Sequence, residues 1–166
     1  MLKKFVSSIL AIVLLAGCGS KEGKDQGASE TQNRQSCAEI AETLVNDLDL
    51  GDSVTEAKTR VVYGSFFNAR EGDEGLPVTD AAAYLPAEKN SDTVAVFETT
   101  DAETVKTLLE TYLSAQKALS EMYSPEEVFK ISNAVIDTNN DGSLVVLTVC
   151  SDIEAAKAKV SEVLGK

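Results

Sequence analysis

Four residues near the C-terminal end raise the question of calcium binding. The string Asp137-x-Asn139-x-Asp141-Gly142 matches the opening of an EF-hand loop, whose side chains supply oxygen ligands to Ca²⁺. The twelfth position of such a loop needs a bidentate acid, but here it is Thr148, inside an apolar segment. A hairpin turn explains the same Asn, Asp and Gly residues, because they tolerate positive φ. We therefore expect a turn and no metal site.

The string Ser114-Ala115-Gln116-Lys117 matches the Ser-x-x-Lys of penicillin-recognising enzymes, in which the lysine tunes the serine for acyl transfer. The Ser-Asp-Asn and Lys-Thr-Gly strings that accompany it in those enzymes are absent. The four residues also lie inside a long amphipathic segment, where Ser and Lys are ordinary surface residues. The chain contains no histidine, which excludes Ser-His and Cys-His nucleophile pairs and imidazole metal ligands. We therefore expect a non-enzymatic protein with no catalytic residues and no cofactor.

The start of the chain has the pattern of a secretion signal. Lys3 and Lys4 give it a positive start, and residues 5–15 form an uncharged, mostly apolar run. This run is too short for a membrane-spanning helix, which needs about 20 residues. It is typical of the apolar region of a signal peptide, which we expect to comprise residues 1–17.

The string Leu15-Ala16-Gly17-Cys18 closes that run and resembles the lipobox of bacterial lipoproteins. In that family the cysteine thiol receives a diacylglyceryl group, and the signal is cut just before the cysteine. The resemblance implies that Cys18 is the lipidation site and holds the protein at the outer face of the bacterial cell membrane. Each buried CH₂ of an acyl chain contributes about 0.8 kcal/mol, so two or three chains give firm anchoring. An ordinary secretion signal with a coincidental cysteine is the alternative.

The segment that follows has the composition of a spacer. Residues 19–35 contain no large apolar side chain and are rich in Gly, Ser, Gln and charge, which favours a flexible tether. We therefore divide the chain into a signal peptide at 1–17, a lipidated cysteine and tether at 18–35, and a single α+β domain at 36–166. The formal net charge of −12 repels phosphate backbones, so we expect no nucleic-acid partner.

Two cysteines remain once Cys18 carries lipid. Cys37 and Cys150 both fall at the ends of expected elements, and an exported location permits a disulfide between them. The alternative is a pair of free, partly buried thiols that behave as small hydrophobic side chains. We keep both interpretations and slightly favour the free thiols.

Capping boxes and hydrophobic spacing predict the elements of the domain. Ser/Thr-x-x-Glu strings open expected helices at Ser36, Ser53, Thr100 and Ser151, and a short helix begins at Ser124-Pro125. Expected strands cover residues 80–85, 93–98, 131–137 and 143–150. The simplest packing is a two-layer α+β fold of about four mainly antiparallel strands, with helices chiefly on one face.

The acidic residues Glu71, Asp73, Glu74 and Asp80 form a further group that could attract cations or a basic partner. Such a run is more often a solvated loop, and we expect one here.

Tyr112, Tyr123 and Phe129 surround the corner Tyr-Ser-Pro-Glu-Glu. An exposed aromatic set at this corner would indicate a binding groove. We expect these rings instead to pack between the long helix and the sheet.

The stretch from Asp80 to Leu164 resembles a family of small lipoproteins of Gram-positive bacteria, catalogued as domain of unknown function 4358. The resemblance rests on the order of a few strings: Thr93-Val94-Ala95-Val96-Phe97, an acidic helix start at Asp101, a long helix carrying Gln116, Tyr123-Ser-Pro-Glu-Glu, a strand with Asn133, Leu144-Val145-Val146-Leu147, and Ser151-Asp152. It implies a membrane-anchored extracellular domain. It brings no assigned activity and no catalytic residues, and Cys37 and Cys150 are not part of it.

We therefore expect a lipid-anchored interaction or accessory module whose protein partner the sequence does not define. A small-ligand or cation-binding lipoprotein of the cell envelope is the alternative. An envelope enzyme ranks third, because no recognisable catalytic arrangement is present.

Overall fold

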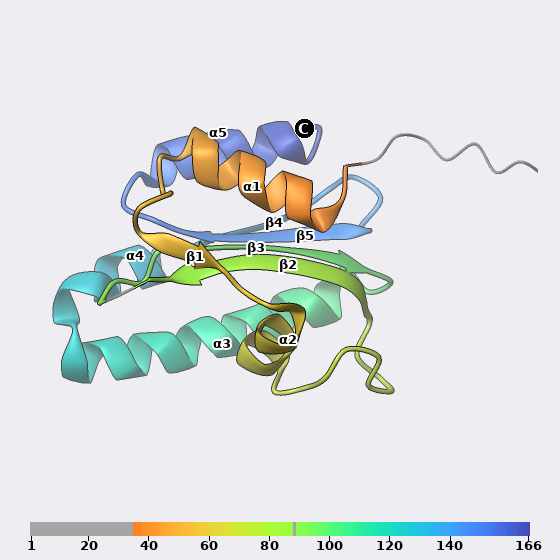
Figure 1. Ribbon diagram of the computed structural model, residues 1–166, viewed down its shortest axis with the longest axis horizontal. Helices are drawn as coiled ribbons and strands as arrows, with labels where there is room; N and C mark the ends of the chain where they lie inside the picture. Colours follow the sequence, from red (N-terminus) through yellow and green to blue (C-terminus); the bar gives the residue numbers. More distant parts are fainter. Residues whose placement is uncertain (1–34, 88) are drawn as a thin grey trace, which may run out of the picture. The chain divides into compact units, whose positions relative to one another are not determined.

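The computed structural model describes residues 35–87 and 89–166, which form an antiparallel sheet between two layers of helices (Figure 1). The helices are α1 (Cys37–Asp47), α2 (Thr59–Phe67), α3 (Ala102–Tyr123), α4 (Val128–Ser132) and α5 (Ile153–Val163), and a 3₁₀ turn spans Pro125–Glu127. The strands are β1 (Val54–Glu56), β2 (Val78–Pro86), β3 (Thr93–Thr99), β4 (Val135–Thr138) and β5 (Leu144–Val149).

The strand order is β1-β2-β3-β5-β4, and every pairing is antiparallel. The two innermost strands, β3 and β5, run side by side with Thr93 opposite Val149 and Glu98 opposite Leu144. Both are almost continuously apolar instead of alternating. A strand with helices on both of its faces requires that pattern.

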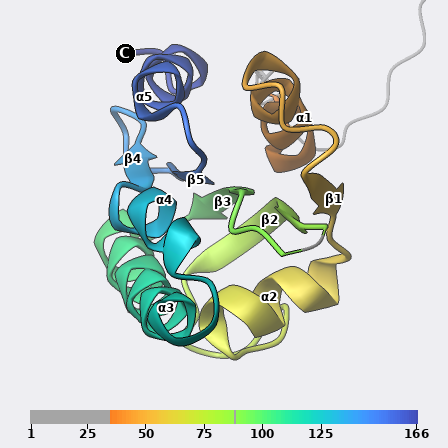
Figure 2. The same ribbon diagram turned by 90° about the vertical axis from the view of Figure 1, so that its left-hand side faces the viewer.

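The hydrophobic core is divided between the two faces of the sheet. Val94 and Val96 point to one side and pack with α1 and α5, whereas Ala95 and Phe97 point to the other side and pack with α2 and α3. Successive side chains of a strand point in opposite directions, so one strand serves both cores. Figure 2 shows α1 and α5 on one side of the sheet, with α2, α3 and α4 on the other.

The structure confirms the α+β class and the antiparallel sheet, and it differs from the expected arrangement in two details. The sheet has a fifth strand, and helices cover both of its faces, so the molecule has three layers and not two. The spacing of apolar residues identifies the buried side of each helix. The spacing does not indicate which face of the sheet each helix covers.

The additional strand lies where a helix was expected to open at Ser53. Ser53 donates its hydroxyl to the Leu50 carbonyl at 3.0 Å instead of capping a helix. Val54 and Thr55 are β-branched and pair with β2, with Thr55 opposite Leu85. The helix α2 begins only at Thr59, so sheet pairing prevails over the local capping signal.

The strand expected at residues 131–137 also begins later in the chain than predicted. Ile131 belongs to α4 and is buried there, and β4 begins at Val135. The capping box at Ser36 is confirmed, with the Glu39 amide donating to the Ser36 hydroxyl and the Ser36 amide to the Glu39 carboxylate. Among the described residues, none of the helices has the length and apolar character needed to cross a bilayer.

Candidate functional site

Large apolar side chains are exposed where α3 turns into α4. Met122 is 71% exposed, Tyr123 74% and Phe129 62%. We call these three residues the α3–α4 corner; this turn lies at the left-hand end of the molecule in Figure 1. The helix α3 ends here because Pro125 follows Ser124 and a proline cannot donate a helical hydrogen bond. Exposed apolar residues that come from one short segment are typical of an interaction site.

An ion-pair network fixes this corner to the sheet. The Lys130 ammonium on α4 lies 3.0 Å from the Asp92 carboxylate and 3.1 Å from the Glu127 carboxylate. Glu127 also accepts hydrogen bonds from the Ser91 amide at 2.8 Å and the Ser91 hydroxyl at 2.6 Å. The network therefore joins α4 to the connection between β2 and β3.

The side chains of this network are largely buried, so their charges depend on one another. Burial alone would raise the pKa of Glu127, but the hydrogen bonds from Ser91 and Lys130 outweigh it and lower that pKa. Burial alone would lower the pKa of Lys130, but Asp92 and Glu127 outweigh it and raise that pKa. The pair is therefore ionised over a wide range around neutral pH.

A small hollow lies between the β2–β3 connection and α3. It has a volume of about 70 Å³ and is lined by polar side chains that include Ser91, Thr93, Gln116 and Ser120. Burial raises the pKa of Tyr112, which also lines the hollow, and a hydrogen bond with Thr93 partly offsets this rise. The hollow has room for about two water molecules. Pockets for drug-sized ligands have roughly 300–1,000 Å³, so this one is too small for such a ligand.

The expectation that these aromatic rings pack between the long helix and the sheet is confirmed for Tyr112 and is wrong for Tyr123 and Phe129. Tyr112 packs inward, with its ring centroid 4.6 Å from that of Phe66. Tyr123 and Phe129 face solvent instead. Phe129 also lines an open groove of about 570 Å³ with Asp152 and Lys157 near the start of α5.

The calcium-like string forms the hairpin turn between β4 and β5. Asn139 accepts hydrogen bonds from the Ser143 and Leu144 amides, and Asp137 pairs with Lys166 at 2.6 Å. Gly142 has φ +71°, which the turn requires and glycine adopts without strain. Within the described residues, no group of three or more His, Cys, Asp or Glu side chains could hold a metal ion.

The Ser-x-x-Lys string lies in the middle of α3, as expected. The Ser114 hydroxyl donates to the Glu110 carbonyl of its own helix at 2.8 Å. Both Ser114 and Lys117 are exposed. This geometry is that of a helix surface.

The two described cysteines are free and buried. Cys37 interacts with Asp80 and Glu98, whereas Cys150 follows Val149, which pairs with Thr93 at the other end of β3. At about 3.4 Å per residue, the length of β3 separates the two thiols by far more than a disulfide spans. Burial, followed by the charge of Asp80, raises the pKa of Cys37 to about 12. Cys18 lies outside the described residues.

The acidic group divides between a loop and a strand. Glu71, Asp73 and Glu74 are exposed in the loop after α2, where Asp73 accepts the Arg70 amide at 2.8 Å. Asp80 belongs to β2. This hydrogen bond closes a turn within the loop. Among the described residues, no further contact of these carboxylates suggests a cation site.

The ion-pair network is the part of the site that sequence reasoning missed. The spacing of Glu127 and Lys130 is that of a helical i, i+3 pair and could have indicated their contact. Nothing local in the sequence places Asp92 or Ser91 beside them, because these residues come from a different part of the chain.

Comparison with known families finds a similarity in the central part of the domain. The model of the family described as Domain of unknown function (DUF4358) matches residues 77–150. This range runs from the start of β2 to the end of β5 and includes the α3–α4 corner and its ion-pair network. No curated protein and no solved structure matches the chain. The match overlaps residues 80–150 of the stretch that was expected to resemble this family, so that part of the chain is similar to DUF4358.

Proposed function

We propose that this protein is a lipid-anchored lipoprotein on the outer face of the bacterial cell membrane, where its domain binds another protein without catalysing a reaction. The observation that carries the proposal is the α3–α4 corner, where Met122, Tyr123 and Phe129 are exposed on a turn held by a buried ion-pair network. A rigid support lowers the entropy that these side chains lose on binding. Aromatic residues and methionine are enriched in protein interfaces.

The position of the corner relative to the start of the domain supports a protein partner over the membrane surface. The described chain enters α1 at Ser36, and Cys37 interacts with Glu98 near the end of β3. From that end, α3 runs through 22 residues, or about 33 Å, to the corner. Figure 1 shows the start of α1 and the α3–α4 turn at opposite ends of the domain. The point where the described chain enters the domain and the corner therefore lie at opposite ends of the domain.

The charge of the chain also supports a protein partner. A net charge of −12 disfavours contact with anionic lipid head groups and nucleic acids. The hollow between the β2–β3 connection and α3 is too small for a drug-sized ligand, which favours an interaction surface over a ligand pocket there.

Photo-crosslinking in intact membranes tests the interaction. A photoreactive amino acid in place of Tyr123 should capture a discrete protein. The same probe at Asn46, which is exposed on α1, serves as the control and should capture none. If both positions give the same products, or neither gives any, the proposal fails.

The anchor has its own test. The Cys18→Ala variant should lose acyl labelling and should no longer fractionate as a mature lipoprotein with the membranes. Unchanged acyl labelling of that variant would contradict the anchoring role of Cys18.

A further inference from the structure

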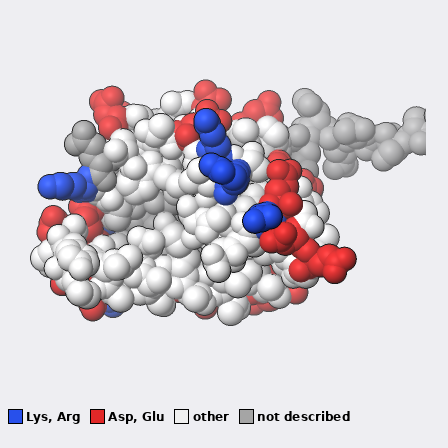
Figure 3. Space-filling model, turned by 60° about the horizontal axis from the view of Figure 1, so that its bottom comes forward, with Lys and Arg blue, Asp and Glu red and all other residues white. Residues whose placement is uncertain are grey.

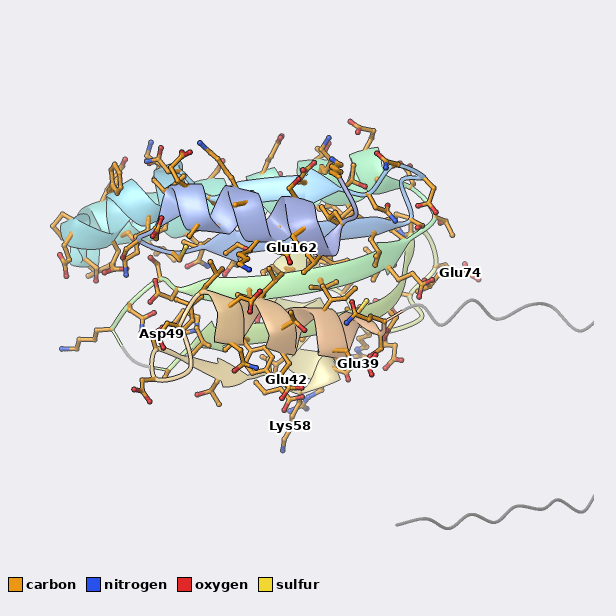
Figure 4. The ribbon with its side chains drawn as sticks, turned by 90° about the horizontal axis from the view of Figure 1, so that it is seen from above. Glu39, Glu42, Asp49, Lys58, Glu74 and Glu162 are labelled. Atoms are coloured by element: carbon orange, nitrogen blue, oxygen red, sulfur yellow. The ribbon has the colours of Figure 1, made fainter. Side chains whose placement is uncertain are left out.

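The outward side of α3 is uncharged, although the chain as a whole is strongly acidic. Its exposed residues include Thr104, Thr107, Thr111, Ala115 and Ala118. Figure 3 shows a broad area without charged side chains on the underside of the molecule, with charged side chains along its lower edge. The opposite face is different. There α1 has outward carboxylates, among them Glu39 and Glu42 labelled in Figure 4, and no basic residue. Two copies of an acidic chain repel each other least where such a face is free of charge.

A row of alternating charges runs along α3 beside the uncharged side. It consists of Lys106, Glu110, Lys117 and Glu121. Within the described part of the chain, Glu110, Lys117 and Glu121 have no ion-pair partner, and Lys106 pairs with Glu103 at 3.0 Å. Glu110 and Lys117 are about 10 Å apart along the helix, so they cannot pair with each other.

When the row is read in the opposite direction, each position has a charge of the opposite sign. Lys106 and Glu121 are equally distant from the midpoint between Leu113 and Ser114, and so are Glu110 and Lys117. If a second α3 lay antiparallel with a two-fold axis at this midpoint, each lysine would face a glutamate of the other copy. A parallel arrangement would place the two rows on opposite sides of the interface, where their charges could not pair.

We propose that the partner for this side of α3 is a second copy of the same chain, docked antiparallel about a two-fold axis between Leu113 and Ser114. A two-fold interface uses the same patch on both copies and must be self-complementary, which the charge row satisfies. In antiparallel helix pairs, the same flank of each helix meets across the interface. Glu110 therefore pairs with Lys117 of the second copy, and Lys117 with Glu110 of the second copy.

The uncharged residues fit the same register. Leu108 and Leu119 are also equally distant from the midpoint, so each Leu108 meets Leu119 of the second copy. Leu119 is 53% exposed in the single chain, and this contact would cover it. Thr111, Ala115 and Ala118 are small and permit the close approach of 8–10 Å typical of packed helices.

A groove next to the two-fold axis offers room for side chains of the second copy. It has a volume of about 470 Å³ and is lined by Glu110, Ser114 and Lys117 of α3 together with Ile131 and Ile136. The dimer does not rest on the proposed function, because it is argued from α3 between Lys106 and Glu121 and does not use Phe129 on α4.

Charge reversal in the full-length chain, measured by sedimentation equilibrium in detergent, tests the interface. The wild-type chain should form dimers. Glu110→Lys or Lys117→Glu alone should weaken dimerisation roughly tenfold, because each change places two like-charged pairs in the dimer. The double variant E110K/K117E restores both pairs in reversed order and should recover wild-type dimerisation. Glu42→Lys on α1 changes the net charge as Glu110→Lys does and should leave dimerisation unchanged.

Disulfide trapping gives a second reading of the same geometry. Ser114 lies beside the two-fold axis, so Ser114→Cys should form a disulfide with the same residue of the second copy. Thr104 lies far from the axis, so Thr104→Cys should form none. The circular dichroism spectrum of each variant establishes that it is folded. A monomeric wild-type chain overturns the proposal, and so do equal effects of E110K and E42K or a failure of the double variant to recover. If the chain is monomeric and the charge-reversal variants lose binding to a different protein, this face of α3 binds that protein. That result would likewise overturn the proposed dimer.

Discussion

The Lys130 ammonium on α4 lies 3.0 Å from the Asp92 carboxylate at the start of β3, and this contact joins the exposed corner to the sheet. The helix α4 has five residues and a single buried side chain, Ile131. A helix of this length is not stable by itself in water. The ion pair and the burial of Ile131 therefore determine where Phe129 points.

Replacement of Lys130 by methionine should destabilise the domain strongly. The change leaves the largely buried carboxylates of Asp92 and Glu127 without a counter-charge, which costs about 2–4 kcal/mol in pairs of this kind. Lys157→Met removes a lysine from an exposed i, i+3 pair with Glu154 and should cost less than about 0.5 kcal/mol. Urea unfolding monitored by circular dichroism gives both values, and equal losses would show that the Lys130 pair has no special role.

The pH dependence of stability should reflect the lowered pKa of Glu127. A carboxyl whose pKa is lower in the folded state stabilises the fold above its unfolded value near 4.5, and this contribution is lost as the pH falls through the folded value. Glu127→Gln should therefore reduce stability by about 1–2 kcal/mol at pH 7, with the difference from wild type shrinking below pH 4. The exposed neighbour Glu126 provides the matched control. Glu126→Gln should give melting curves parallel to those of the wild type at every pH. A difference for Glu127→Gln that stays constant down to pH 3 would contradict this assignment.

The elements were predictable where local signals and tertiary packing agree. The capping box at Ser36 and the apolar strand at Val94 and Val96 are confirmed because the same residues satisfy both the local backbone and the core. Ser53 shows the opposite case, because its capping signal yields to the pairing of Thr55 with β2. The candidate site combines both situations. Tyr123 and Phe129 stand out in the sequence, but the direction of Phe129 depends on the contact of Lys130 with Asp92, which no local pattern reveals.

Cys37 and Cys150 should resist thiol reagents in the native protein and react when it is unfolded. Burial raises the pKa of both thiols, that of Cys37 to about 12, so the reactive thiolate is scarce near neutral pH. Alkylation with and without denaturant, followed by peptide mass spectrometry, measures this directly. A peptide pair joined through Cys37 and Cys150 in a sample kept free of reductant would contradict the separation of the two thiols along β3.

Replacement of Phe129 by alanine should separate binding from stability. The ring is mostly exposed, so its loss should change the free energy of unfolding by less than about 0.5 kcal/mol. It should nevertheless abolish capture of the protein partner by a probe at Tyr123, because the ring is one of the three exposed side chains of the corner. Phe66→Ala is the complementary variant. Phe66 is buried and lies 5.3 Å from Phe97 between ring centroids, so its loss should cost about 3–5 kcal/mol. Normal partner capture by a folded Phe129→Ala variant would show that the α3–α4 corner is not the binding surface.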